Sequence, residues 1–285
     1  MKAKQSPWKR LATLVVMIGP ALLIAVGIVI YPIINTIIKS FQDSKTGAFT
    51  LANYQKLFTG KLYVASIWYT IWVTVATVVL AIVISYLLAL YLRFTDNRIS
   101  RFISTIYLLP RFIPVLVAVY ALKMIIGDTG LLNRLMLKLF GWDYKPGLLY
   151  NAKGIIIANL WFNIPFATMI LSAALSGVSS SIVESAQDVG AGKLLILFKM
   201  ILPLTVGDIM IAAVFIFMSN ISSFTTPYLI GANYPKMLGV TLNSEFGNHH
   251  YEFAAAISVL IFLLSLVSAV VYIHTNLKER EWEKN

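Results

Sequence analysis

The chain alternates between long apolar stretches and shorter polar breaks. Each long stretch holds about twenty or more residues with few charges, the length that a helix needs to cross roughly 30 Å of hydrocarbon. Because lipid offers no partners for backbone N–H and C=O groups, such stretches close their own hydrogen bonds as α-helices. The pattern predicts a single all-α domain over residues 1–285 with about six transmembrane helices. The predicted spans are residues 11–38, 64–92, 102–126, 153–176, 203–224 and 253–275.

Three segments depart from this alternation. Pro110, Arg111 and Pro114 lie inside the third span, which we therefore expect to be kinked or broken. The break at 41–63 mixes polar and aromatic residues, which favours an interfacial helix. Residues 127–152 carry glycine and asparagine turn signals and are expected to form a loop.

The break between the fourth and fifth spans, residues 177–202, carries helix start and stop signals. Ser181 and Glu184 fit a capping box, in which a hydroxyl and a carboxylate accept hydrogen bonds from N–H groups at a helix start. Gly190 and Gly192 are suited to end that helix and turn the backbone, and Pro203 to open the next apolar segment. We expect a short exposed helix, a sharp turn and a return to the membrane.

Composition places the protein in a membrane. It is 59% hydrophobic and 12% charged, with a mean hydropathy of +0.80, whereas soluble domains carry about twice that charged fraction. The net charge of +11 does not indicate nucleic-acid binding, because the basic residues lie in the polar breaks and not in one patch with interleaved aromatics. The absence of cysteine excludes disulfides and thiolate metal sites. The first apolar stretch is too long for a signal peptide and is expected to be a retained span.

The basic residues also predict an orientation. Twelve Lys and Arg lie in residues 1–10, the turn at 93–101, the 177–202 break and the C-terminal tail, against seven in the remaining breaks. Cytoplasmic segments of membrane proteins are enriched in Lys and Arg. Both termini and the 177–202 break are therefore expected to be cytoplasmic.

The 177–202 break resembles the "EAA" loop of permease subunits in binding-protein-dependent type I ABC importers. Ser185 replaces the alanine usual at the second position, one small residue for another. The positions in register are Glu184, Ala186, Gly190, Ala191, Leu202 and Pro203. The resemblance implies the fold of those permeases, a bacterial inner-membrane location, and a second permease subunit that is either a similar chain or another copy. It also implies two cytosolic ABC ATPase subunits, which bind ATP and Mg, and an extracytoplasmic solute-binding protein.

The resemblance implies that the loop couples this chain to the ATPases. A short helix held outside the bilayer by a sharp turn can lie in a groove on a cytosolic motor and move with it. Small residues allow close approach, and Glu184 supplies a cap or an ion pair. The alternative is an ordinary connector with a capping box. The predicted coupling residues are Glu184, Ser185, Ala186, Gly190, Ala191, Gly192, Leu202 and Pro203.

Catalysis within this chain is not indicated. Residues 190–193 read Gly-Ala-Gly-Lys, but a phosphate loop needs glycine where Gln187 stands, and Ser or Thr where Leu194 stands. His249 and His250 are adjacent and have no third ligand at a helical spacing, so we expect no metal site. No nucleophile–base arrangement emerges elsewhere. We therefore expect no cofactor in this chain and assign ATP hydrolysis to a partner subunit.

Polar residues inside the spans are candidates for a solute path, which needs hydrogen-bonding groups and an aromatic wall in place of water. Each has an alternative role. Ser and Asn also join neighbouring membrane helices, Arg111 is long enough to reach the membrane surface, and Asp208 can pair with a basic residue near the inner surface. The candidate path residues are Arg111, Trp161, Asn163, Ser219, Asn220 and Ser223.

The substrate class is indicated only by short stretches. Residues 224–231 are similar to the T-P-x-x-L-G stretch of permeases for polyamines, iron and phosphonates, so a small polar solute of that branch is expected. Residues 53–58 read N-Y-x-x-L-F and are shared with sugar permeases, which makes an oligosaccharide the alternative. A stand-alone secondary transporter would need coupling carboxylates inside the membrane, of which Asp208 is nearly the only candidate. A membrane scaffold without transport would leave the loop's glutamate and glycines unexplained.

Overall fold

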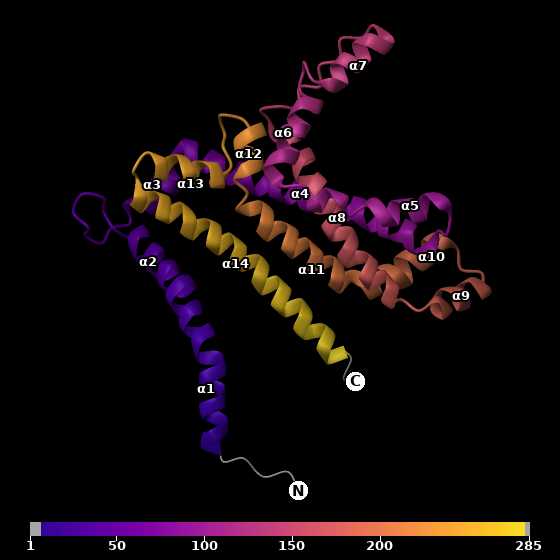
Figure 1. The fold of residues 1–285 in the computed structure, drawn as a ribbon, viewed down its shortest axis with the longest axis horizontal. Coiled ribbons are helices and arrows are strands. Elements are labelled where there is room, and N and C mark those ends of the chain that lie inside the picture. Colours follow the sequence, from indigo (N-terminus) through magenta and orange to yellow (C-terminus); the bar gives the residue numbers. More distant parts are fainter. Residues whose placement is uncertain (1–6, 283–285) are drawn as a thin grey trace. The chain divides into compact units, whose positions relative to one another are not determined.

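The computed structural model describes residues 7–282, and within that range its elements are helices joined by turns and loops, with one isolated β-bridge between Gln42 and Phe49 (Figure 1). The first elements are α1 (Pro7–Ile24), the π-helix η1 (Ala25–Ile30), α2 (Tyr31–Ser40), α3 (Ala52–Thr59), α4 (Lys61–Phe94) and α5 (Arg98–Ile106). The next are the 3₁₀ turn η2 (Leu109–Phe112), α6 (Val115–Ile126), α7 (Leu131–Phe140), α8 (Ala152–Gly177), α9 (Ser180–Asp188) and α10 (Lys193–Ile196). The last are the π-helix η3 (Leu197–Ile201), α11 (Leu202–Ile221), α12 (Thr225–Ile230), α13 (Leu238–Gly247) and α14 (Tyr251–Trp282).

Six helical stretches of the described chain are long and apolar enough to cross a membrane. The prediction of an all-α membrane protein with about six spans is thereby confirmed. The stretches are Val15–Ser40, Lys61–Phe94, Val115–Phe140, Ala152–Gly177, Lys193–Ile221 and Tyr251–Val270.

The third apolar segment is interrupted where its prolines predict. Pro110 lies in η2, and Pro114 precedes the first residue of α6. Residues 98–126 therefore form α5, η2 and α6 in succession, with α5 beside α4, η2 against α8 and α6 against α12.

Residues 127–152, expected to be a loop, contain the helix α7. A turn at Gly127 and Gly130 separates α7 from α6, although the whole stretch from α6 to α7 is apolar.

The chain divides into two compact units, one made of Met1–Gly60 with Leu242–Leu260 and the other of Lys61–Thr241 with Ile261–Asn285. In the first unit, polar contacts of the N-Y dipeptide hold α3 to the end of α2. The Tyr54 hydroxyl lies 2.7 Å from the Ser40 Oγ. The Asn53 amide donates to the carbonyls of Ser40 and Gln42 at 3.1 and 2.9 Å. The helix expected in the 41–63 break is thus α3, and its Asn and Tyr have a structural role.

Close packing of α4 against α8 organises the second unit. The buried face of α4 carries small side chains at spacings of three and four residues, which lets two membrane helices approach closely. These residues are Ser66, Thr70, Thr74, Thr77, Ala81, Ser85 and Ala89. The Ser85 hydroxyl donates to the Ile164 carbonyl of α8 at 3.0 Å. On the other side of α4, the Tyr86 hydroxyl lies 2.9 Å from the Thr205 Oγ1 of α11.

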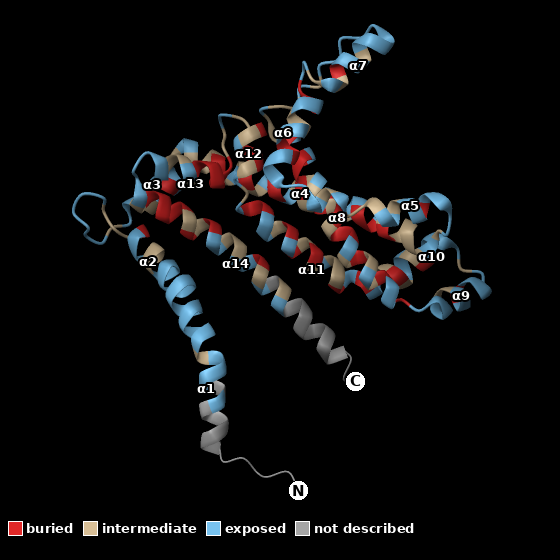
Figure 2. Cartoon of the chain, viewed as in Figure 1, coloured by how far each residue is buried: buried red, intermediate tan, exposed pale blue. Residues whose placement is uncertain are grey.

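The core of this unit extends to the end of α8 that leads into α9. Leu171 and Leu175 of α8 are buried there together with Ala186 of α9, Ile196 of α10 and Ile216 of α11. Figure 2 shows buried positions along α4, α8 and α11, with exposed positions on other sides of the same helices. The exposed sides of the predicted spans are largely apolar, as a lipid-facing surface requires.

Replacing Gly154 with alanine is expected to destabilise the start of α8 by about 1–3 kcal/mol, because overpacking forces backbone shifts. A Cβ at this position would overlap the carbonyl oxygen of Leu148 and lie 2.8 Å from Ile230 Cγ2. Thermal unfolding of the purified protein in detergent measures the effect. Gly177→Ala in the same helix is the control, since a Cβ there meets nothing within 4 Å. Equal thermal midpoints for the two variants would contradict this packing.

Candidate functional site

Six of the predicted coupling residues, from Glu184 to Gly192, lie on α9 and the turn that follows it, immediately after the end of α8 (Figure 1), and the other two, Leu202 and Pro203, lie at the start of α11. The expected capping box is wrong. Helix α9 begins at Ser180 with Ser179 as its N-cap, which places Ile182 where the box needs an acid. In the described chain Ser179 makes no side-chain capping bond, and its hydroxyl lies 2.5 Å from that of Ser181.

The turn after α9 is a Schellman motif, in which a left-handed residue lets two N–H groups bond back to the helix end. Gly190 has φ +81° and its N–H donates to the Gln187 carbonyl at 2.8 Å. The Ala191 N–H donates to the Ala186 carbonyl at 3.0 Å. Left-handed backbone is unfavourable for residues with a Cβ, which explains glycine at 190. The prediction that Gly190 ends this helix is confirmed.

The loop has an inner and an outer side. Ala186 is buried in the hydrophobic core, and Ala191 packs partly against that core, so these two small residues let α9 lie close to its own chain. Glu184 and Ser185 are exposed, and Val189 is 84% exposed. A shallow hollow of about 510 Å³ lies on the loop. Its lining residues are Ser181, Ile182, Ser185, Ala186, Val189, Ala191 and Met200.

The return to the membrane begins earlier than expected. Pro203 lies in the first turn of α11, as expected for a helix start, but the continuous helical stretch Lys193–Ile221 already begins at Lys193, with Gly192 as the N-cap of its first helix. A proline within a helix has no N–H to donate, and its ring crowds the preceding turn. The π-helix Leu197–Ile201 lies directly before this position and widens that turn, which accommodates the proline. Leu202 packs partly against the core, and Pro203 is exposed.

Arg93, at the end of α4, holds the base of α9. Its Nε donates to the Leu175 carbonyl at 3.3 Å, and its Nη2 donates to the Val178 carbonyl and the Ser180 Oγ at 3.4 and 3.3 Å. A guanidinium can bond the free carbonyls at a helix C-terminus, where a positive charge is also favoured. In the sequence, Arg93 is recognisable only as an orientation signal. Its acceptors are mainly backbone carbonyls more than 80 positions away, so no motif marks them.

The candidate path residues on α8, on α11 and just after α11 differ in exposure: two are buried, two are exposed and one is half-buried. Asn163 donates to the Asn220 Oδ1 at 3.4 Å and to the Asn159 carbonyl at 2.8 Å. Asn220, 3% exposed, donates to the Ile216 carbonyl at 2.7 Å. The structure thus brings these two asparagines together as a buried bond between the helices. Trp161 and Ser219 are exposed and Ser223 is half-buried, so these three can face another chain or a solute.

Arg111 lies in the turn that interrupts the third apolar segment. Its guanidinium carbon is 4.8 Å from the centroid of the Phe166 ring on α8, and the residue is exposed in this chain. Irregular backbone inside a membrane is tolerated where it lines a cavity or meets protein.

Asp208 is half-buried in α11, and no described basic residue lies within ion-pair distance of it. The pairing suggested for Asp208 is therefore not seen within the described chain.

Comparison with known sequences gives the relatives of this chain. Residues 81–281 match the family described as the binding-protein-dependent transport system inner membrane component. The spermidine/putrescine transport system permease protein PotB of Escherichia coli K12 is 23% identical over 225 residues, which cover 79% of this chain and 82% of PotB. PhnU of Salmonella typhi, provisionally named as a 2-aminoethylphosphonate transport system permease, is 25% identical over 250 residues, covering 86% and 85%.

Two solved structures share the fold. A chain of a bacterial alginate ABC transporter, in complex with an alginate pentasaccharide-bound periplasmic protein, superposes with a TM-score of 0.80 at 19% identity and covers 97% of both chains. A chain of the inward-facing MetNI methionine ABC transporter gives a TM-score of 0.54 at 16% identity and covers 75% of this chain and 96% of that chain. The family match extends from α4 to α14 and includes α9 with its turn. The chain therefore belongs to the family of inner-membrane permease components of binding-protein-dependent ABC transport systems.

Proposed function

We propose that this chain is one of two permease subunits of an ATP-driven importer, and that α9 is the surface on which a separate cytosolic ATPase docks. The observation that carries the proposal is the construction of α9. It leaves the end of α8 with its inner face packed on the core, its base held by Arg93 and its far end closed by the Gly190 turn. Glu184, Ser185 and Val189 face outward and are open to a partner.

In this proposal, the cycle is alternating access. ATP binding draws the two ATPase subunits together, and α9 moves with the subunit on which it is docked. Because only Val178 and Ser179 separate α8 from α9, and both helices pack in the same core, the displacement reaches α8 and the helices packed on it. The spans change from inward-facing to outward-facing and accept solute from an extracytoplasmic binding protein. This chain supplies the path and the coupling, while ATP and Mg are bound by its partners.

The proposed orientation places both termini and α9 in the cytoplasm. Arg93, Arg98, Arg101, Lys193 and Lys199 support it, since they lie around one end of α4, α8 and α11, and basic residues are enriched on the cytoplasmic side. We assign to the path the exposed polar and aromatic residues Arg111, Trp161 and Ser219. Ser223, another candidate for the path, is half-buried.

The proposed substrate is a small polar solute of the polyamine, iron or phosphonate branch. The similarity of residues 224–231 to the T-P-x-x-L-G stretch and the likeness of the chain to PotB and PhnU support this branch. An oligosaccharide is the second candidate, supported by the likeness to an alginate transporter chain over nearly the whole length.

Cross-linking tests the docking surface directly, because the native chain has no cysteine. Val189→Cys is expected to form a cross-link to a phosphate-loop ATPase that copurifies with the tagged full-length chain. Leu139→Cys on α7, where the native side chain is 67% exposed, is the matched control and is expected to give no such adduct. An impermeant thiol reagent that labels Val189→Cys from outside intact cells would reject both the orientation and the docking role.

A further inference from the structure

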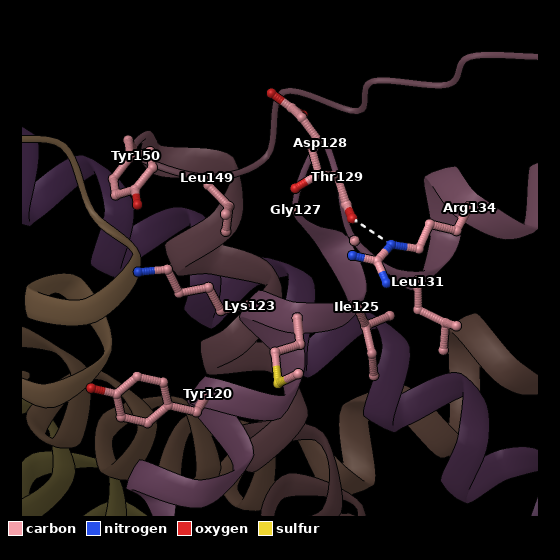
Figure 3. Close-up of a pocket in the computed structure, with 12 residues that line it drawn as sticks. Tyr120, Lys123, Ile125, Gly127, Asp128, Thr129, Leu131, Arg134, Leu149 and Tyr150 are labelled. Carbon is pink, nitrogen blue, oxygen red and sulfur yellow. Dashed lines mark hydrogen bonds between the residues drawn. The ribbon is translucent and has the colours of Figure 1, made fainter. Parts of the chain in front are cut away.

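A cavity of about 850 Å³ lies at the end of the second unit opposite α9 (Figure 3). Its walls come from the last turn of α6, the Gly127–Gly130 turn, the start of α7 and the two residues Leu149 and Tyr150 that precede α8. Helix α8 separates this cavity from α9, and its 26 residues correspond to about 39 Å of helix. In the proposed orientation the cavity therefore opens on the extracytoplasmic side.

Backbone hydrogen bonds hold both walls in place. The Gly130 N–H donates to the Gly127 carbonyl at 2.8 Å, and a Cβ on Gly130 would lie 2.6 Å from the Met124 carbonyl oxygen. On the other wall, the Tyr150 N–H donates to the Ile230 carbonyl at 2.6 Å. Asp128 joins the cavity to the α7–α8 connection by accepting a hydrogen bond from the Gly147 N–H at 2.8 Å. The cavity is thus formed by ordered backbone.

Beyond α7, a polar cluster supports the same connection. The Asn133 amide donates to the Asp128 carbonyl at 2.6 Å and to the Asp143 Oδ1 at 3.1 Å. Hydrogen bonds from Lys145 and Asn133 hold the pKa of Asp143 below its ordinary value. Asp143 therefore stays ionised and bound to Lys145 and Asn133, so its carboxylate is not the counter-ion of the cavity.

The cavity holds a half-buried cation without a counter-ion. The Lys123 Nζ donates to the Leu229 carbonyl at 3.4 Å and lies 5.3 Å from the centroid of the Tyr150 ring. Within the described chain, neither Lys123 nor Arg134 forms an ion pair with a carboxylate. Asp128 is the one acidic residue among the lining residues, so the lining carries two positive charges and one negative charge. Burying an ammonium group without a counter-ion is costly, and a bound anion offsets that cost.

We propose that this cavity binds an oxyanion, such as a phosphate, phosphonate or carboxylate group. In Figure 3 the Lys123 amine and the Tyr120 and Tyr150 rings lie toward one end, and Arg134 lies toward the other. The ammonium supplies a point charge at one end, and the guanidinium offers donors in a planar arrangement at the other. A polyamine does not fit, because its ammonium groups would face these two cations.

Two sources can supply such a group. One is the transported solute on its way from a binding protein, an interpretation that rests on the proposed function and favours phosphonates over polyamines. The other is the headgroup of an anionic phospholipid, since lysine, arginine and tyrosine are common at membrane interfaces.

The experiment uses the full-length chain with the subunits that copurify with it. Thermal midpoints are measured in a titration with inorganic phosphate against chloride at equal ionic strength, because a ligand that binds the folded state raises the midpoint. Native mass spectrometry counts the phosphatidylglycerol molecules retained from mixed micelles. Lys123→Gln is expected to weaken the binding of either phosphate or phosphatidylglycerol, whichever occupies the site, about tenfold or more. Lys123→Arg is expected to retain that binding. Lys138→Gln, on the exposed surface of α7, is the control and leaves binding unchanged.

Phosphate binding that depends on Lys123 assigns the site to a soluble oxyanion, and phosphatidylglycerol retention that depends on Lys123 assigns it to a lipid. Binding of neither ligand, equal binding by Lys123→Gln, or stronger protection by spermidine would overturn the proposal. The assay involves no ATP hydrolysis, so a permease that fails to capture an ATPase still gives a clear answer here.

Discussion

Replacing Glu184 with arginine is expected to lower solute-stimulated ATP hydrolysis by the assembled transporter about tenfold or more. Glu184 is exposed on α9, and in the described part of the chain its carboxylate has no hydrogen-bond or ion-pair partner. Reversing its charge therefore costs the fold little. At an interface with a partner, the loss of a charge pair typically costs 2–5 kcal/mol or more, and each 1.4 kcal/mol is about tenfold in affinity.

The measurement is ATP hydrolysis in reconstituted lipid discs, with and without a solute-loaded binding protein. Lys138→Glu is the matched control, because it also reverses an exposed charge but lies on α7, away from the proposed docking surface. Thermal midpoints of both variants should equal that of the unmodified protein. Transport at the normal rate by Glu184→Arg would show that docking does not involve this face of α9.

Replacing Arg93 with glutamine is expected to separate ATP hydrolysis from transport. The guanidinium bonds the Leu175 and Val178 carbonyls and the Ser180 hydroxyl, which ties the end of α4 to the base of α9. Without it the ATPase still finds the exposed face of α9, but displacement of α9 reaches α4 less directly. We expect the ATPase to copurify normally and the ratio of solute transported to ATP hydrolysed to fall about tenfold, the equivalent of about 1.4 kcal/mol.

Two further variants make this test specific. Arg93→Lys keeps the charge but reaches fewer of the three acceptors, so we expect an intermediate ratio. Arg98→Gln removes an exposed charge at the start of α5 and should behave like the unmodified protein. If transport and hydrolysis fall in parallel in Arg93→Gln, the residue supports folding or docking and not coupling.

The spans could be predicted because their signal is local. Apolar runs of sufficient length must be helical in lipid, and the prolines at 110 and 114 mark the break in the third segment. The helix end at Gly190 was equally local, since the left-handed turn demands glycine. Pro203 lies in the first turn of α11 but does not mark where the helical stretch begins, because a proline after a π-helix looks the same in the sequence as one that opens a span. The helix α7 was missed because its flanking glycines read as a loop.

The interactions that build the site are less visible in the sequence. Arg93 bonds backbone carbonyls, which every residue carries, so nothing in the residues around 175–180 marks them as its partners. Ser181 and Glu184 have the spacing of a capping box, yet the chain leaving α8 sets the helix start at Ser180. Asn163 and Asn220 were equally suited to a solute path and to a helix contact, and only their spatial arrangement shows that they bond each other.

The packing of α4 on α8 restricts which parts of the protein can move. The buried face of α4 carries mostly side chains of one to three heavy atoms, and the larger Leu171 and Leu175 of α8 are fully buried in the same core, so neither helix can slide or rotate past the other without steric overlap. The pair must therefore travel as a rigid body. Hinges are then confined to places where the backbone already departs from regular helix: the 109–112 turn, the link at 178–179 and the wide turn at 197–201.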